Sequence, residues 1–554
     1  MADRHGGQIL VDQLKIQGVR RVFSVPGESF LAALDGLHDS GIENIVCRHE
    51  GGATMMAEAH AKLTGQPGVV FVTRGPGATN GSAGIHIARQ DSTPLIMFVG
   101  QIDNNHRDRE AFQEVNYREF FKPIAKWAAE VDQTDRLPEY ISRAFHLAQS
   151  GRPGPVVLAL PENMLSARAD VPDIPAVAPQ PPFVCSDQLD AILGMLCGAK
   201  RPLVIAGGSV WSHDTSLDLA KFAENFDLPV CATFRRQDRI DNRHSHYAGD
   251  LGVGMNPALE QRLRDADCLL IIGARFGDIA TGGYEIVKPG APGKTIIHIH
   301  PDPDELGRVF RPDLGFAAPA VDVIAKLARR DAPEHPDWTG WTRAARADYA
   351  AWVTPKASPG AVQLEAVMKH LSDTLPDDAI ATNGAGNYAA WVHRYFRARG
   401  FPGHLAPTSG SMGYGFPAAI AAKLEHPDRT VVCFAGDGCF QMTLNEMSTA
   451  RQYGAAVVTI VANNGRYGTI RMHQERHYPG RVSGTDLFNP DYAALARAYG
   501  GHGERVDRTE DFAAAFDRAV ASGLPAVIEL TLDPEALSPG MTLSETRAKA
   551  EKNA

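Results

Sequence analysis

Two motifs in the last third of the chain place hard oxygen donors directly after apolar runs. The run TVVCFAGDG sets Asp437 between Gly436 and Gly438, and AVVTIVANN ends in Asn463 and Asn464. Magnesium prefers oxygen ligands, usually one or two protein groups together with phosphate oxygens. Glycines let the backbone approach a diphosphate closely, and the start of a helix favours negative charge. The residue types therefore predict a site for a magnesium ion and a diphosphate.

The spacing of the two motifs fits one shared site. The 24 residues between Gly438 and Asn463 include the helix-compatible FQMTLNEMSTARQYG, which suits a single strand–helix–strand crossover. Both motifs would then lie at the same edge of a parallel sheet. The Asp437 carboxylate, the Asn464 amide oxygen and the Arg466 backbone carbonyl are the predicted metal ligands. Because a GDG or an NNG alone is a common turn, the prediction depends on their pairing.

A second kind of chemistry is indicated near the N-terminus. Glu50 ends the β-rich run IENIVCRHE and comes just before two glycines and a helical stretch. In isolation, a glutamate at this position is most often a solvated residue at the start of a helix. The segment RHEGG…AEAHAKLTG closely resembles the one that carries the activating glutamate in the acetolactate synthase (acetohydroxyacid synthase) group. The GDG…NN pair resembles the thiamine-diphosphate motif of the same enzymes.

The resemblance implies that the chain binds thiamine diphosphate through Mg²⁺, with Asp437, Asn464 and the Arg466 carbonyl as metal ligands. Glu50 would face the pyrimidine N1′ of the cofactor as the catalytic acid, a form of general acid–base catalysis. Further matched positions would hold the diphosphate (Gly386, Asn387, Tyr388), accept a hydrogen bond from the cofactor's 4′-amine (the Gly410 carbonyl), and bend the cofactor (Met412).

The substrate side is less well defined. In AFQE, Phe112 and Gln113 match positions that line the family's active site, and Tyr467, Met472 and His473 are further pocket candidates. Glu28 could reach the substrate or cap a helix. Arg74 could attract a substrate carboxylate or form a structural ion pair. The tryptophan-containing pattern of the biosynthetic synthases does not follow NNGRYGTIRMHQE, which argues against a role in branched-chain amino-acid synthesis.

The function implied is a carboligase or decarboxylase of the acetolactate synthase type. A 2-oxo acid would add to the C2 carbanion of the cofactor and lose carbon dioxide, and the resulting enamine would attack a second carbonyl. One alternative is a thiamine-diphosphate-dependent lyase or decarboxylase of acyl-CoA or acyloin substrates. Another is a catalytically inactive regulatory paralogue. In the middle of the chain, Gly207, Gly208 and GARFGD (273–278) resemble flavin-contact stretches, which leaves FAD, an adenine nucleotide or an empty central domain open.

Positioning these residues requires an α/β fold. Unbroken apolar runs such as VVFVTRG, PLVIAGG and AVVTIVANNG suit strands buried on both faces of parallel sheets, and helix-compatible stretches separate them. A proline-rich linker (171–183) and a second break (331–360, with a short helix) divide the chain. Three consecutive doubly wound domains are predicted at 1–170, 185–330 and 360–545, for the pyrimidine, a central site and the diphosphate with Mg²⁺.

Composition and net charge limit the classes of protein to which this chain can belong. The 554 residues carry a net charge of -10, which argues against a nucleic-acid partner. Seven scattered cysteines suit reduced thiols, and no apolar run reaches the roughly 20 residues that a membrane helix needs. The sequence thus predicts a cytoplasmic enzyme with a small-molecule substrate, a 2-oxo acid. The family resemblance adds a homodimer or homotetramer, in which Glu50 of one subunit faces the diphosphate site of another.

Overall fold

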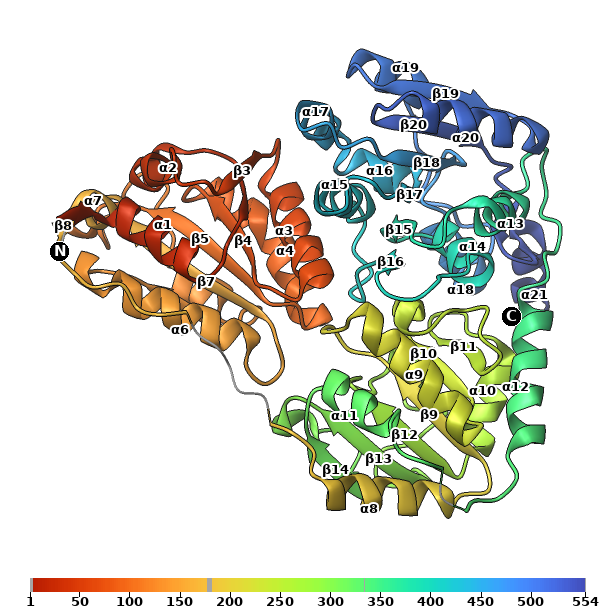
Figure 1. Cartoon of the computed structure of the whole chain (residues 1–554). Helices are drawn as coiled ribbons and strands as arrows, with labels where there is room; N and C mark the ends of the chain where they lie inside the picture. Colours follow the sequence, from red (N-terminus) through yellow and green to blue (C-terminus); the bar gives the residue numbers. More distant parts are fainter. Residues whose placement is uncertain (1–2, 177–181, 333, 554) are drawn as a thin grey trace. The chain divides into compact units, whose positions relative to one another are not determined.

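Three parallel six-stranded sheets, each covered by helices, follow one another along the chain in the computed structural model (Figure 1). The structure describes residues 3–176, 182–332 and 334–553, so part of the predicted linker at 171–183 lies outside the described residues. The predicted α/β class with three doubly wound sheets is confirmed. Within the described residues, every helix is too short or too polar to cross a membrane.

The chain divides into two compact units. The first consists of Met1–Gln180, Ile420–Glu425 and Thr443–Tyr453, and the second of Pro181–Ala419, His426–Met442 and Gly454–Ala554. The second unit contains both the central and the C-terminal sheet. The domain boundaries at 1–170, 185–330 and 360–545 stay predictions.

The first unit is built on a sheet with strand order β3-β2-β4-β5-β7-β6. Helices α3 and α4 pack together on one face, and α1, α2, α6 and α7 pack together on the other (Figure 1). The strands are β2 (Arg21–Ser24), β3 (Glu43–Val46), β4 (Gly68–Val72), β5 (Leu95–Gln101), β6 (Trp127–Glu130) and β7 (Pro155–Pro161). The helices are α1 (Gly6–Ile16), α2 (Leu31–Leu37), α3 (Glu50–Thr64), α4 (Pro76–Asp91), α5 (Tyr117–Phe121), α6 (Leu137–Gln149) and α7 (Glu162–Ser166).

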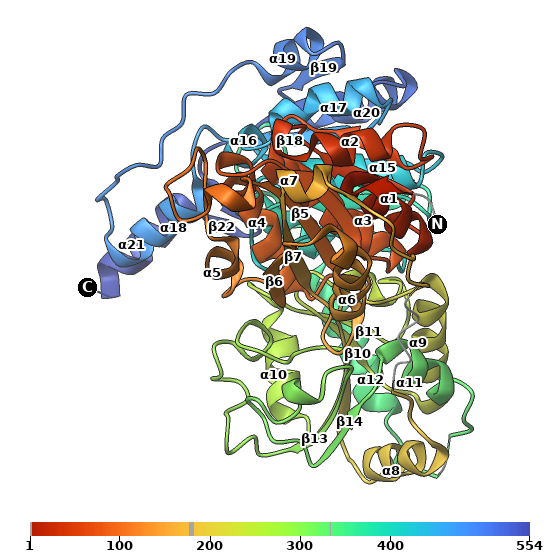
Figure 2. The same ribbon diagram turned by 90° about the vertical axis from the view of Figure 1, so that its left-hand side faces the viewer.

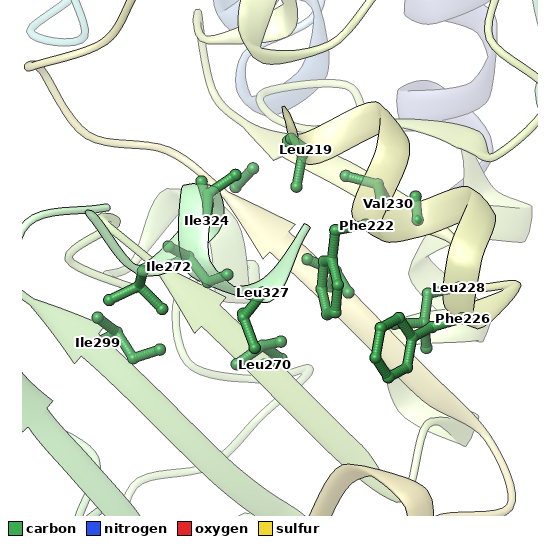
Figure 3. Packing of buried hydrophobic residues seen from close by; sticks show 14 of the residues in the cluster. Leu219, Phe222, Phe226, Leu228, Val230, Leu270, Ile272, Ile299, Ile324 and Leu327 are labelled. Carbon is green, nitrogen blue, oxygen red and sulfur yellow. The ribbon is translucent and has the colours of Figure 1, made fainter. Parts of the chain in front are cut away.

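The central sheet has the order β11-β10-β9-β12-β13-β14. Along β12, Leu270 and Ile272 join the core cluster on one face, whereas Leu269 and Ile271 join the cluster on the other. This alternation is the period-2 geometry of a strand buried on both sides, and Figure 3 shows the first of these clusters. The strands are β9 (Pro202–Ala206), β10 (Val230–Thr233), β11 (Tyr247–Leu251), β12 (Cys268–Ile272), β13 (Thr295–His300) and β14 (Leu314–Ala317). The helices are α8 (Ser186–Cys197), α9 (His213–Phe226), α10 (Pro257–Asp265) and α11 (Ala320–Leu327).

The second break contains a longer helix than the sequence suggested, α12 (Thr339–Trp352). Ala345 and Tyr349 on one side of this helix are buried against the central domain. Arg262 of α10 donates to Asp348 at 2.6 Å. Aromatic and small residues at helical spacing therefore make this segment part of the central domain's core and not a free linker.

The C-terminal sheet repeats the topology of the first, with order β16-β15-β17-β18-β20-β19. Its strands are β15 (Ile380–Asn383), β16 (His404–Leu405), β17 (Val431–Gly436), β18 (Val458–Asn463), β19 (His502–Val506) and β20 (Ala526–Thr531). Its helices are α13 (Leu364–Thr374), α14 (Tyr388–Tyr395), α15 (Gly415–Glu425), α16 (Asp437–Gln441), α17 (Met447–Gln452), α18 (Gly468–His477), α19 (Tyr492–Ala498), α20 (Phe512–Ala521) and α21 (Leu543–Asn553).

The last helix, α21, lies beside α18 (Figures 1 and 2). Arg547 of α21 donates to both carboxylate oxygens of the buried Glu475 of α18, each at 2.7 Å. This interaction lowers the pKa of Glu475 to about 2. The C-terminal helix thus fixes the helix that carries Met472 and His473.

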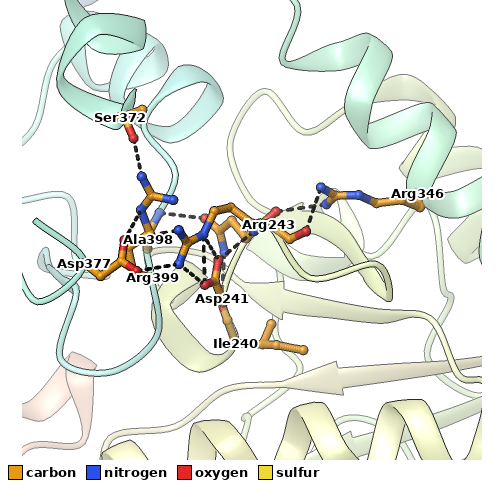
Figure 4. A network of polar contacts seen from close by, with 9 residues as sticks. Ile240, Asp241, Arg243, Arg346, Ser372, Asp377, Ala398 and Arg399 are labelled. Atoms are coloured by element: carbon orange, nitrogen blue, oxygen red, sulfur yellow. Dashed lines mark hydrogen bonds and ion pairs between the residues drawn. The ribbon is translucent and has the colours of Figure 1, made fainter. Parts of the chain in front are cut away.

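A polar network joins the central and C-terminal sheets inside the second unit (Figure 4). Arg243 binds the Asp241 carboxylate at 2.7 Å and Asp377 at 3.1 Å. Arg346 of α12 donates to the Arg243 carbonyl at 3.1 Å. Because both aspartates meet the same guanidinium, this network ties the turn before β11 to the turn before β15.

Replacing Phe222 by alanine tests the central core. Phe222 of α9 is fully buried, so Phe222→Ala removes buried apolar surface and leaves a cavity. We expect the free energy of unfolding of the central domain to fall by about 3–5 kcal/mol in urea unfolding followed by fluorescence. Leu217→Ala, on the exposed side of the same helix, is the control, with an expected change within about 0.5 kcal/mol. Equal losses for both variants would contradict this packing.

Asp250 gives the central domain a pH-dependent stability. Burial raises the pKa of Asp250 from 3.8 to about 7 in the folded protein. Because the unfolded chain loses this proton first, the free energy of unfolding falls as pH rises between about 4 and 7 and then levels off. Asp250→Asn removes this dependence, so its stability advantage over the wild type should grow through that range in urea unfolding. A difference that is flat with pH would be contrary to the expected ionisation.

Candidate active site

The Asp437 carboxylate is the centre of the predicted metal site. Asp437 is buried at the end of β17, and its Oδ1 accepts a hydrogen bond from Gly438 N at 2.8 Å. Its Oδ2 accepts from Gly465 N at 2.9 Å and from Asn489 Nδ2 at 2.8 Å. Burial raises the pKa of Asp437, since the charged form loses its hydration. A bound cation would stabilise this buried negative charge.

The asparagine turn lies on the neighbouring strand, as the crossover spacing predicts. Strands β17 and β18 pair in parallel with Gly436 opposite Ala462. The Asn463 side chain donates through Nδ2 to Glu529 Oε1 at 2.7 Å. Asn464 Oδ1 accepts from Arg466 N at 3.2 Å, so both proposed ligands share one tight turn. One carboxylate, one amide oxygen and one backbone carbonyl form the mixed oxygen set that suits Mg²⁺ together with phosphate oxygens.

Glycines give this edge of the sheet the close approach that a diphosphate needs. A Cβ on Gly438 would lie 2.5 Å from the Tyr467 ring, and one on Gly436 would lie 3.0 Å from the Tyr388 ring. Gly386 has a φ of 141°, a conformation that residues with side chains rarely adopt. The donor set and these side-chain-free surfaces fit magnesium and a diphosphate.

The start of α14 is fixed from two sides. Tyr388 is buried, and its hydroxyl accepts a hydrogen bond from Gly384 N at 3.0 Å. The Asn387 side chain accepts from Thr469 Oγ1 of α18 at 2.8 Å and donates to the Leu537 carbonyl at 2.9 Å. Its Nδ2 is also 3.8 Å from the Met472 sulfur. The structure therefore brings the start of α14 and helix α18 together.

The remaining predicted residues of the second unit occupy varied positions. Met412 packs against the C-terminal core, and the next residue, Gly413, donates to the Cys439 sulfur of α16 at 3.2 Å. Gly410 is exposed in the same loop. His473 is exposed, with its ring centroid 6.3 Å from that of His477.

Three residues that support Asp437 were not predicted from the sequence. Asn489 donates to Asp437 and also to Asn463 Oδ1 at 2.9 Å. The Tyr492 hydroxyl donates to the Asp437 carbonyl at 3.1 Å, and Glu529 accepts from Tyr492 N at the same distance. Asn489 and Tyr492 lie in NPDY, which reads as an ordinary turn before a helix, and Glu529 lies within a strand. Only the fold places them beside the GDG loop.

Glu50 begins α3 in the first unit and is buried. The preceding His49 caps the helix by accepting from Gly51 N at 3.0 Å, so His49 has a structural role there. Glu50 Oε2 accepts from Asn80 Nδ2 of α4 at 3.0 Å. A Cβ on Gly77 would lie 3.2 Å from Glu50 Oε1. The loop formed by Gly75, Pro76 and Gly77 therefore packs directly against the carboxylate. Asn80, three residues further along the chain, was not predicted as the partner of Glu50.

Other candidates lie at the same edge of the first sheet. Arg74 donates to Glu162 Oε2 at 3.1 Å and to Glu28 Oε1 at 3.5 Å. A Cβ on Gly75 would lie 2.8 Å from Gln113 Cβ, which places Gln113 against the loop that adjoins Glu50. Phe112 is 74% exposed and contributes no core packing within the described residues. The first unit thus groups Glu50, Arg74, Glu28 and Gln113.

The central sheet has the strand order 3-2-1-4-5-6 that is typical of dinucleotide-binding folds. Its switch point lies between β9 and β12, where a Cβ on Gly208 would be 2.5 Å from the Gly273 carbonyl oxygen. The Gly208 carbonyl already accepts hydrogen bonds from Arg236 Nε at 3.1 Å and Arg239 Nη2 at 2.8 Å. The strand order is therefore compatible with a nucleotide at this edge of the sheet. However, Arg236 and Arg239 already donate to the Gly208 carbonyl there.

Comparison with known proteins decides the family. Models of the thiamine pyrophosphate enzymes match all three parts of the chain: the N-terminal TPP binding domain at residues 4–120, the central domain at 189–327, and the C-terminal TPP binding domain at 384–530. Acetolactate synthase isozyme 2 large subunit of Escherichia coli is 32% identical over 96% of both chains.

The chain belongs to the thiamine pyrophosphate enzymes, in the group of the acetolactate synthases. The acetolactate synthase large subunit of Lactococcus lactis is 30% identical over 95% of this chain and 92% of its own. The mitochondrial acetolactate synthase catalytic subunit of Saccharomyces cerevisiae is 31% identical over 95% of this chain and 80% of its own. The protein is therefore a thiamine-diphosphate-dependent enzyme that forms carbon–carbon bonds, a carboligase of 2-oxo acids.

Removing the Asp437 charge tests the metal site. Asp437→Asn keeps the shape of the side chain but loses the carboxylate that a cation requires, so Mg²⁺-dependent binding of thiamine diphosphate should weaken at least about 10-fold. Isothermal titration with and without EDTA measures this effect. Asp517→Asn, at an exposed position on α20, should bind like the wild type. Unchanged, EDTA-insensitive binding in Asp437→Asn would rule out this ligand.

Proposed function

We propose that this enzyme decarboxylates a 2-oxo acid such as pyruvate and joins the remaining acyl unit to a second carbonyl compound. The observation that carries the proposal is the buried Glu50 carboxylate, held by Asn80 against the glycine loop in a chain that also keeps the Asp437–Asn464 metal motif. The names of its relatives, acetolactate synthases, support a 2-oxo acid as the donor.

In this proposal the chain's own residues bind and activate the cofactor. Asp437, Asn464 and the Arg466 carbonyl bind Mg²⁺, and Gly386, Asn387 and Tyr388 hold the diphosphate. The Gly410 carbonyl orients the aminopyrimidine and Met412 supports its bent shape. Glu50 exchanges a proton with the pyrimidine N1′. When bound, thiamine diphosphate supplies a nucleophilic carbon and an electron sink for decarboxylation.

The substrate-pocket candidates in this proposal are Glu28, Arg74, Phe112 and Gln113 of the first unit and Tyr467, Met472 and His473 of the second. The Tyr467 ring packs against Gly438, and Met472 lies beside Asn387, so both belong to the diphosphate edge. This placement favours contact with the reacting end of a small substrate.

A second candidate function is a lyase or decarboxylase of acyl-CoA or acyloin substrates with the same cofactor. The dinucleotide-type strand order of the central domain favours a site there for an adenine nucleotide or FAD. Titration of the protein with FAD and with ADP, followed by fluorescence, separates these ligands. A catalytically inactive paralogue is disfavoured by the retention of Glu50, Asp437 and Asn464 together.

The proposed assembly is a homodimer or homotetramer, in which Glu50 of one subunit faces the diphosphate site of another. The bacterial relatives are named large subunits, which supports a smaller partner subunit as a further component. A cytoplasmic location is proposed because the seven cysteines are free thiols. Sedimentation analysis of the purified protein gives the size of the assembly.

The proposed activity is tested with pyruvate. Purified protein with thiamine diphosphate and Mg²⁺ should release carbon dioxide from pyruvate and form a 2-hydroxy carbonyl product, identified by NMR. Glu50→Gln should lower the rate about 10²- to 10⁴-fold, because the amide cannot exchange the proton. Glu43→Gln, on the exposed side of the preceding strand, should keep full activity. Pyruvate that survives unchanged while the cofactor binds would refute the assigned donor.

A further inference from the structure

The turn that follows β10 in the central domain contains a residue that its backbone does not favour. Arg236 N donates to the Thr233 carbonyl at 3.0 Å, which closes a four-residue turn with Arg235 at its third position. The φ angle of Arg235 is 59°, and a turn position with positive φ usually holds glycine or asparagine. Residues strained in this way persist where the surrounding structure requires them, often at functional sites. An arginine here is therefore explained by what its side chain binds.

The Arg235 guanidinium binds the loop that carries Gly410 and Met412. Arg235 is buried, and its Nη1 donates to the Pro407 carbonyl at 2.6 Å. The same carbonyl oxygen accepts from Gly410 N at 3.0 Å and so closes the turn 407–410. A carbonyl oxygen has two lone pairs and can accept both bonds, and a charged donor makes the stronger one. Arg235 thus holds the first residue of the turn whose last residue is Gly410.

The neighbours of Arg235 fix the backbone on both sides of this contact. Arg236 Nη1 donates to the Arg235 carbonyl at 2.8 Å, which holds the strained residue in place. Asp238 Oδ2 accepts from Gly403 N and from His404 N, each at 3.3 Å. These two amides lie at the start of β16, the strand that leads into the loop. The guanidinium and the turn 407–410 therefore meet in a geometry that the surrounding backbone defines.

We propose that Arg235 is a positioning residue for cofactor activation, which acts through the turn 407–410 to hold the Gly410 carbonyl in place for the aminopyrimidine. The inference rests on the proposed role of Gly410, and it gives the central domain a part in the chemistry at the C-terminal sheet. Without the guanidinium, the turn has one hydrogen bond fewer, so Gly410 and the nearby Met412 lose their fixed position. Binding of Mg²⁺ at Asp437 does not depend on this contact.

The variant Arg235→Gly separates the guanidinium from the backbone. Glycine adopts a φ of 59° without strain, so this variant keeps the turn after β10 and loses only the side chain. Should it fail to fold, Arg235→Asn gives the same comparison, because asparagine tolerates the left-handed conformation. Arg262→Gln is the matched control. Arg262 is also buried in the central domain and donates to a backbone carbonyl, that of Trp341 at 3.1 Å.

Amide hydrogen exchange of residues 406–412, followed by mass spectrometry on the full chain without added cofactor, measures the turn directly. We expect this segment to exchange about 10-fold faster in Arg235→Gly than in the wild type, because the bond to the Pro407 carbonyl is lost. Arg262→Gln should leave the rate unchanged. Equal exchange in the wild type and in Arg235→Gly would overturn the positioning role, whatever the enzyme does with pyruvate.

Exchange of the C2 proton of bound thiamine diphosphate for deuterium measures the chemical consequence and needs no substrate. Enzyme saturated with thiamine diphosphate and Mg²⁺ is mixed with D₂O, stopped with acid and analysed by NMR. Arg235→Gly should lower the rate constant about 10- to 100-fold, the usual worth of a hydrogen bond to a charged group. Arg235→Lys keeps a charged donor and should lose less, and Arg262→Gln should exchange like the wild type.

The two measurements separate this inference from the proposed function. Faster amide exchange in Arg235→Gly together with an unchanged C2 rate would overturn the proposal, because the turn would then have no effect on activation. A slow C2 rate in the wild type that Glu50→Gln does not change would refute the proposed activation of the cofactor. In that case the amide exchange still decides whether Arg235 positions the Gly410 turn.

Discussion

The buried carboxylate of Asp437, at the end of β17, is the constraint on which the carboxyl edge of the C-terminal sheet depends. The hydrogen bonds from Gly438, Gly465 and Asn489 offset part of the lost hydration, yet the pKa of Asp437 remains raised. A buried charge of this kind is stable when a cation compensates it. In the proposed site, the asparagine turn on β18 and the glycine surfaces around it would bind the magnesium ion and the diphosphate.

The first and C-terminal sheets have the same strand order, so both place the loops after their strands in the same way. In each, the strands that flank the switch point end in loops that bear proposed site residues: Glu28 and Arg74 in one, Gly386 and Asp437 in the other. Parallel strands place all their carboxyl ends at one edge, so residues far apart in sequence meet without long connections. The central sheet, with its dinucleotide-type order, differs from both.

Much of this arrangement could be predicted from sequence because the signal is local. Runs such as VVFV and VVCFAG form strands buried on both faces, and the GDG and NN motifs follow two of them directly. Six strands of the three large sheets were missed. Five of them, β6, β11, β14, β16 and β19, lie at sheet edges, where one side needs no partner and the apolar run is shorter or interrupted. The sixth, β10, is an interior strand of only four residues. Periodicity alone does not detect such strands.

The supporting side chains could not be predicted for a different reason. Asn489, Tyr492 and Glu529 reach Asp437 or each other only through tertiary folding, and their local sequence resembles an ordinary turn and strand. Likewise, Arg74 and Glu28 gave two open interpretations from sequence. Geometry shows that they pair with each other, and that Glu162, 88 residues further along the chain, also binds Arg74.

A crystal structure of the enzyme with thiamine diphosphate and Mg²⁺ tests the proposed metal and pyrimidine contacts most directly. We expect the metal to be bound by Asp437, Asn464 and the Arg466 carbonyl, and a Glu50 carboxylate to face the pyrimidine ring. A metal bound by other residues, or a pyrimidine with no contact to any Glu50 carboxylate, would contradict it.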